Sequence, residues 1–154
     1  MAFKGTYREA GWQRCAAMSE SDGIVFTPWP HTDHYPRWSL PALEAAKCAA
    51  RQGPDAFDRV HLRFYEAFFS RSLDIGDPAQ VVKLVSEADL DQERFQADYR
   101  AGAGRPEVIA DYQAAIEAGV RAIPTVIFPD SGRSVVGLAS ADDYRAAMEE
   151  AARC

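Results

Sequence analysis

The residues with the most evident chemistry are three cysteines, Cys15, Cys48 and Cys154, which lie far apart in the sequence. A redox thiol reacts as the thiolate, which a helix N-terminus or a neighbouring cation favours, and a second thiol resolves the mixed disulfide. The chain contains no Cys-x-x-Cys motif, so its spacing assigns no such pair. Cys48, in an alanine-rich helix, and Cys15 are both interpreted as small buried hydrophobes. Cys154 is the last residue, and nothing near it in the sequence would activate its thiol.

A second group of candidate ligands, His31, Asp33 and His34, lies in a proline-rich loop. Imidazole and carboxylate groups bind zinc, and Cys48 or His61 would have to complete the site. Two histidines and one aspartate on a loop are a weak pattern, so we interpret the loop as solvated and assign no metal site. We interpret His61 as a hydrogen-bonded histidine at the edge of the core.

The segment around Pro124 has the pattern of a helix end, a short loop and a hairpin. Gly119 suits the left-handed position that ends a helix. Pro124 precedes a strand, where its missing N–H removes no ladder bond. The β-branched and aromatic residues 126–128 predict a buried strand. A glycine-containing turn at 129–133 and a second strand at 134–138 then predict an antiparallel pair.

Capping residues and prolines divide the rest of the chain into helices. Ser39 with Pro41, and Asp77 with Pro78, are typical helix starts. The alanine-rich helix after Ser39 is expected to be buried on more than one side. The predicted helices are residues 7–19, 40–52, 54–71, one that starts at 78, one from 91 to 102 or 104, one from 106 to 119, and one after Ser140.

Aromatic and apolar positions indicate what these elements bury. Trp29 and Trp38 flank the loop that contains the histidines, and we expect both to seal it against the core. In the last helix, we expect Tyr144, Met148 and Ala151 to face the sheet.

The order of these elements resembles the DsbA family of thioredoxin-fold proteins. The resemblance rests on "GV-x-A-I-P-T-V-I-F" followed by "V-V-G-L", and on "S-L-P-A-L-E-A-A-K" followed by "D-I-x-D-P" and "L-D-x-x-x-F". It is nearest to the FrnE-like cytoplasmic branch, and it implies an α/β thioredoxin-like fold with a large helical insertion. A single domain 1–154 is then expected, with a helical subdomain at 39–104 and the C-terminal half of the thioredoxin fold at 105–154.

The resemblance also implies a site. In the family the proline is cis and the backbone beside it pairs with substrate, so Ile123, Pro124 and Thr125 are the expected substrate-binding residues. The family's first strand and its Cys-x-x-Cys helix have no counterpart here, so the fold is expected to be N-terminally incomplete and the catalytic residues are unknown.

Three functions follow from this resemblance. The first is a thiol–disulfide oxidoreductase-like protein without its own redox dithiol, acting on protein thiols, disulfides or peptides. The second is a glutathione-dependent enzyme of the kappa transferase or hydroxychromene carboxylate isomerase type, with glutathione as a cofactor. The third is a non-catalytic scaffold that binds a peptide or a partner protein.

Composition narrows the partners. The net charge of the 154 residues is −6 and no basic run occurs, which disfavours nucleic acid. No apolar run is long enough to span a membrane, and the odd number of cysteines disfavours a secreted disulfide framework. A cytoplasmic location is therefore expected. Because the strand after Pro124 would lack a neighbour on one side, we also expect a homodimer.

Overall fold

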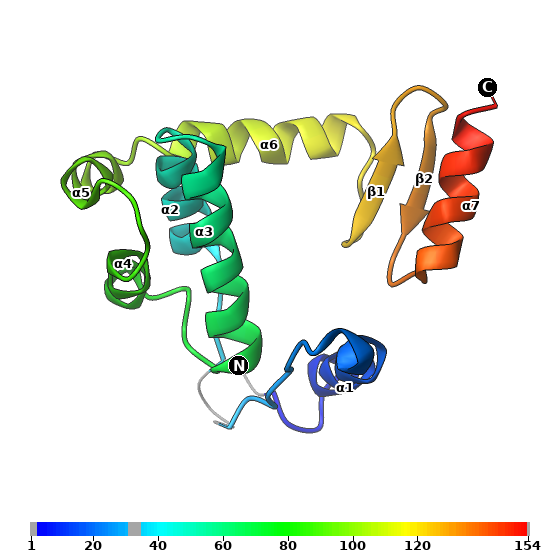
Figure 1. The fold of residues 1–154 in the computed structure, drawn as a ribbon, viewed down its shortest axis with the longest axis horizontal. Helices are drawn as coiled ribbons and strands as arrows, with labels where there is room; N and C mark the ends of the chain where they lie inside the picture. Colours follow the sequence, from blue (N-terminus) through cyan, green and yellow to red (C-terminus); the bar gives the residue numbers. More distant parts are fainter. Residues whose placement is uncertain (1–2, 31–34, 154) are drawn as a thin grey trace. The chain divides into compact units, whose positions relative to one another are not determined.

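The computed structural model describes residues 3–30 and 35–153, which form two compact units, Met1–Val108 and Ile109–Cys154. The first unit is helical, and the second contains a two-stranded sheet (Figure 1). Helix α6, Arg105–Glu117, begins in the first unit and continues into the second. No helix in the described part of the chain is long and apolar enough to cross a membrane.

The first unit begins with α1 and ends with the first turn of α6. Its elements in chain order are α1 (Tyr7–Ser19), the short helix η1 (Glu20–Asp22), α2 (Leu40–Ala50), α3 (Pro54–Tyr65), the π-helical turn η2 (Glu66–Ser70), α4 (Pro78–Ser86) and α5 (Gln92–Arg100). The predicted helix 54–71 is therefore α3 followed by η2, a change of helical period that the sequence pattern did not reveal.

Side-chain caps fix the starts of α1, α4 and α5, because they bond backbone N–H groups that have no partner within the helix. Asp77 accepts a hydrogen bond from the Ala79 amide at 2.9 Å, and Asp91 accepts one from the Arg94 amide at 3.0 Å. Ser39 occupies the predicted N-cap position of α2, but its side chain makes no capping bond.

The core of the first unit is built around α2, which packs against α3, α4 and α5. Its alanine side chains are small, so these helices approach its backbone closely. The prediction that α2 is buried on more than one side is confirmed. The fully buried members of this core are Ala45, Cys48, Ala49, Val60, Ala67, Val81, Leu84, Val85 and Phe95.

A second, aromatic cluster joins α1 to the end of α3 and η2. Phe3, Trp12 and Trp29 are its buried members. The Trp12 indole N–H donates to the Thr27 carbonyl at 2.9 Å, which anchors the loop after α1. Trp29 is buried as expected, whereas the expectation for Trp38 is wrong: this side chain is 58% exposed and its indole N–H donates to the Gly76 carbonyl.

The second unit contains the predicted hairpin and closing helix. β1 (Thr125–Phe128) pairs antiparallel with β2 (Arg133–Val136), with Thr125 opposite Val136, and α7 (Ala141–Ala151) packs against β2. Ser140 starts α7 with a capping box: its hydroxyl accepts from the Asp143 amide, and the Asp143 carboxylate accepts from the Ser140 amide. The Ser140 hydroxyl and the Ser140 amide both donate to the Asp143 carboxylate, and they hold the pKa of that carboxyl below its usual value.

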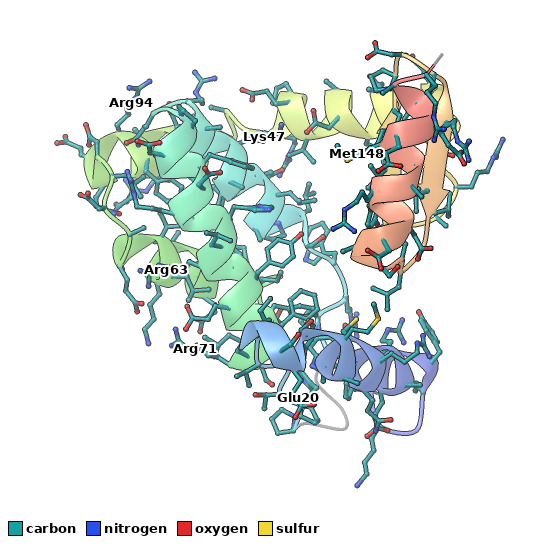
Figure 2. All side chains as sticks on the ribbon, turned by 45° about the vertical axis from the view of Figure 1, so that its right-hand side comes forward. Glu20, Lys47, Arg63, Arg71, Arg94 and Met148 are labelled. Atoms are coloured by element: carbon teal, nitrogen blue, oxygen red, sulfur yellow. The ribbon has the colours of Figure 1, made fainter. Side chains whose placement is uncertain are left out.

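One packing prediction for this unit is wrong. The strand after Pro124 is not buried, since Val126 and Ile127 are 37% and 38% exposed. Ala147 is the buried residue of α7. Met148, which Figure 2 labels on α7, lines a hollow with Phe128 of β1 as expected, although its side chain is 59% exposed. A sheet of two short strands is too narrow to cover all the apolar residues that its sequence supplies.

Candidate functional site

The loop before β1 is held by two hydrogen bonds that start the hairpin. The Ile123–Pro124 peptide bond is cis. The Thr125 hydroxyl donates to the Ala122 carbonyl at 2.6 Å, and the Gly137 amide donates to the Pro124 carbonyl at 2.8 Å. Ile123 is 89% exposed, so the loop presents a large apolar side chain to solvent directly before the proline. The three residues predicted to bind substrate therefore lie where this loop meets the start of β1.

One edge of β1 has no neighbouring strand within the described sheet. Hydrogen-bonded and non-bonded pairs alternate along an antiparallel ladder. Since the Pro124 carbonyl accepts from Gly137, the next bonded pair in the register is Val126 with Val135. The backbone groups of Thr125 and Ile127 therefore point away from β2, which leaves them available to an added extended chain.

The two faces of the hairpin differ in what they contact. Phe128, on one face of β1, lines a shallow hollow of about 240 Å³ together with Met148 and Ala151 of α7. Residues on the opposite face include Ile127 and Val136, which remain exposed. The open edge next to Pro124 is thus bordered by apolar side chains that α7 does not cover.

The described cysteines do not form a redox pair in the position that thioredoxin-type chemistry requires. Cys48 is buried within α2, and burial raises the pKa of its thiol although a hydrogen bond with the Gly104 backbone acts in the opposite direction. Cys15 is only partly buried, so its assignment as a buried hydrophobe is wrong. Both thiols are free, and neither lies at the N-terminus of its helix.

The candidate metal ligands His31, Asp33 and His34 lie outside the described residues. Within residues 3–30 and 35–153, no group of three or more histidine, cysteine or acidic side chains could hold a metal ion. His61 makes no hydrogen bond to another described residue; its ring stacks on Phe57 and meets the edge of Tyr65.

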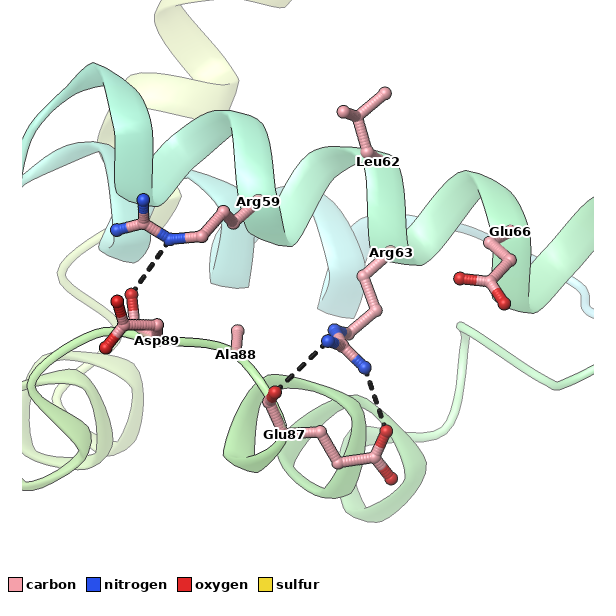
Figure 3. A pocket seen from close by; sticks show the side chains of 7 residues that line it. All are labelled: Arg59, Leu62, Arg63, Glu66, Glu87, Ala88 and Asp89. Carbon is pink, nitrogen blue, oxygen red and sulfur yellow. Dashed lines mark hydrogen bonds and ion pairs between the residues drawn. The ribbon is translucent and has the colours of Figure 1, made fainter.

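The structure also reveals hollows that the sequence analysis missed. One of about 390 Å³ lies between α3 and the end of α4 (Figure 3). Arg63 donates there to the carboxylate and the carbonyl of Glu87, and Arg59 donates to the Asp89 carbonyl. Because Arg63 is paired with the Glu87 carboxylate and Glu66 adds a second carboxylate to the lining, the hollow does not resemble an anion site; its hydrogen bonds link α3 to the end of α4.

A larger hollow, of about 650 Å³, lies where residues 24–26 cross the end of α3 and η2. Its walls are mainly apolar. The apolar run Ile24-Val25-Phe26 forms part of its lining. The structure shows no strand at these residues.

Comparison with known proteins bears on the whole chain. The family model of the DSBA-like thioredoxin domain matches residues 12–149. No curated protein matches the chain. The family match agrees with the predicted α/β fold, which combines many helices with a small sheet. Because it covers most of the sequence, and because the proline loop, hairpin and closing helix follow in the expected order, the chain belongs to the family of DSBA-like thioredoxin domains.

Proposed function

We propose that this chain binds an extended polypeptide substrate of thiol–disulfide exchange at Ile123, Pro124 and Thr125 and along the free edge of β1. Membership of the DSBA-like family supports the class of substrate. The observation that carries the proposal is that two features lie next to each other: the exposed side chain of Ile123, and the backbone groups of Thr125 and Ile127, which have no neighbouring strand in the described sheet. Backbone bonding would supply affinity without regard to sequence, and the apolar side chains would favour apolar segments.

We further propose that these 154 residues bind substrate without performing a dithiol cycle of their own. The sequence has no Cys-x-x-Cys motif, Cys48 is buried, and Cys15 lies in the second half of α1. We expect no appreciable insulin reduction with dithiothreitol as reductant. Turnover comparable to that of thioredoxin that Cys15→Ser or Cys48→Ser abolishes would contradict this.

Backbone NMR tests the binding mode with a built-in control. A blocked, extended nonapeptide with one central cysteine among apolar residues is titrated into ¹⁵N-labelled protein. The amides of Thr125 and Ile127 should shift most, because they face the free edge. The amides of Val126 and Phe128 should shift less, because the register directs them toward β2.

A pair of variants tests the contribution of the loop side chain. Ile123→Asp places a charge at the proposed contact and should weaken peptide binding about tenfold, a loss of about 1.4 kcal/mol. Ile116→Asp, at an exposed isoleucine of α6, should leave binding unchanged. Equal effects of the two substitutions, or shifts confined to residues outside 123–128, would contradict the proposed site.

The same edge supports a second proposal, that the chain forms a homodimer. A strand edge with unpartnered groups is a template for pairing, and a second copy presents the same edge for a twofold contact. A peptide and a second copy would then compete for β1.

A further inference from the structure

The hollow of about 650 Å³ in the first unit is distinct from the proline loop, which belongs to the second. The segment after η1 forms one wall of this hollow, and two hydrogen bonds hold it in place. The Ser70 hydroxyl donates to the Val25 carbonyl at 2.6 Å, and the Thr27 amide donates to the Phe69 carbonyl at 2.8 Å. Phe69 and Ser70, the partners of this segment in the two hydrogen bonds, belong to the π-helical turn η2. Such turns occur frequently at functional sites, because they change the direction of side chains within a helix.

Exposed apolar side chains gather around this hollow. Ile24, Val25, Leu62 and Tyr65 all line it and are all exposed large hydrophobic residues. Single exposed apolar residues are ordinary, but several around one concave surface indicate a binding site. A volume of this size lies within the range of about 300–1,000 Å³ that small-molecule sites occupy.

The ring systems of the lining are already packed in place. Phe69 contacts the rings of Phe26 and Tyr65 with centroid distances of 5.1 and 5.7 Å. Phe69 also packs against the buried Trp12 at 4.9 Å, so the aromatic cluster beneath supports the hollow. A flat aromatic ligand would therefore meet a preformed apolar surface.

Charge narrows the class of ligand. Among the described residues that line the hollow, Glu66 is the one carboxylate. No lysine, arginine or histidine is among them. The carboxylate and the absence of a cation disfavour an anionic ligand. Glu66 is exposed, so solvent screens its attraction for a cation, and the apolar lining favours an uncharged ligand. We propose that this hollow binds a small, uncharged aromatic molecule. This proposal does not depend on the peptide-binding function.

The probe for the test is Nile red, an uncharged aromatic dye, with anilinonaphthalene sulfonate as its anionic counterpart. Cys15 lines the hollow and is partly exposed, whereas Cys48 is fully buried. In a Cys154→Ser background, N-ethylmaleimide should therefore label Cys15. Saturating Nile red should slow this labelling at least fivefold, measured by intact-mass spectrometry, and the sulfonate at the same concentration should not.

Substitution of an exposed lining residue provides the second arm. Val25→Glu adds a carboxylate to the apolar wall while keeping the backbone carbonyl that Ser70 binds, and should weaken Nile red at least tenfold in a fluorescence titration. Val136→Glu is the matched control at an exposed valine of the other unit, and should leave the affinity unchanged.

The outcomes separate clearly. Unprotected Cys15 at saturating dye, or Nile red binding that Val25→Glu leaves intact, would overturn the proposal. Equal protection by the sulfonate would overturn its charge class. If Val25→Glu fails to fold by circular dichroism, protection of Cys15 in the otherwise native chain still decides the question.

Discussion

At the scale of single residues, Gly104 decides how closely the loop before α6 approaches α2. A Cβ at this position would overlap the carbonyl oxygen of Glu44 and lie 3.1 Å from the Lys47 Cβ. Gly104→Ala must therefore displace backbone, and we expect it to lower the free energy of unfolding by about 1–3 kcal/mol. Urea unfolding followed by far-UV circular dichroism measures the change.

Gly11 supplies the matched control for that substitution. It lies inside α1, and a Cβ there would meet only the Arg14 guanidinium, at 3.9 Å. Gly11→Ala should raise the free energy of unfolding by about 0.5–1 kcal/mol, because alanine favours a helix interior. Two glycine-to-alanine changes of the same sign would contradict the role given to Gly104.

Tyr99 should make the free energy of unfolding depend on pH in the alkaline range. Burial, with Glu44 nearby, raises its pKa to about 12, and its hydroxyl donates to the Pro41 carbonyl at 3.3 Å. Between pH about 10 and 12 the unfolded chain therefore loses this proton while the folded chain keeps it, so stability falls as pH rises. Tyr99→Phe should make the fall shallower, as measured by urea unfolding at pH 9 and 11.

Two observations qualify that experiment. Burial also raises the pKa of Tyr35, so part of the alkaline fall should remain in Tyr99→Phe. Tyr112→Phe, which removes a hydroxyl from an exposed side chain, is the control substitution. An identical slope in Tyr99→Phe and the native chain would show that the Tyr99 hydroxyl is not held neutral by folding.

The sequence predicted some properties of the candidate site residues and missed others. The burial of Cys48 was predicted from the sequence, whereas substrate binding at Ile123, Pro124 and Thr125, which the family resemblance implies, stays a prediction. The partial exposure of Cys15 could not be predicted, because burial of a helical residue depends on which elements pack against that helix, and no local pattern encodes this packing.

At the scale of elements, two arginines of α3 fasten the C-terminal end of α4 (Figure 3). The Arg63 guanidinium donates to the Glu87 carboxylate at 2.9 Å and to the Glu87 carbonyl at 3.1 Å. Carbonyls at a helix end have no partner within the helix, so these bonds satisfy them. We expect Arg63→Ala to lower the free energy of unfolding by about 1 kcal/mol, measured by urea unfolding.

A second change separates the charge from the carbonyl bond. Glu87→Gln keeps the bond from Arg63 to the backbone and should cost less than Arg63→Ala, since exposed ion pairs contribute about 0–1 kcal/mol. Arg100→Ala is the control, because Arg100 bonds Gln96 within its own helix. A loss as large in Arg100→Ala would mean that helix propensity, not the link to α4, causes the effect.

Helix boundaries were the most predictable elements, because caps are local. Predictions at Asp77, Asp91 and Ser140 agree with the structure, as does the helix Tyr7–Ser19. The change to a π-helix at Glu66 was not predictable, since a single turn of five residues is too short to show its own apolar period. Strand exposure was also missed, because burial of Val126 depends on what packs against the sheet.

At the scale of the whole molecule, the two compact units carry different surfaces. The first has its own core around α2 and the apolar hollow beside η2. The second has the proline loop and the open edge of β1. The proposed polypeptide and small-molecule sites therefore use separate units, and a variant in one should leave binding at the other unchanged.

The proposed homodimer gives the last prediction. If two copies pair through β1, sedimentation velocity at micromolar concentration should show a species of twice the monomer mass. Ile127→Lys adds a charge on the exposed face beside that edge and should shift the chain toward monomer, because charged residues at a strand edge oppose pairing. Arg145→Glu, at an exposed position of α7, should leave the mass unchanged. Hydrogen exchange gives the independent readout: Thr125 and Ile127 amides should gain protection as concentration rises, while Val126 stays constant. A stable monomer with concentration-independent exchange at Thr125 and Ile127 would contradict the dimer while leaving the edge open to a peptide.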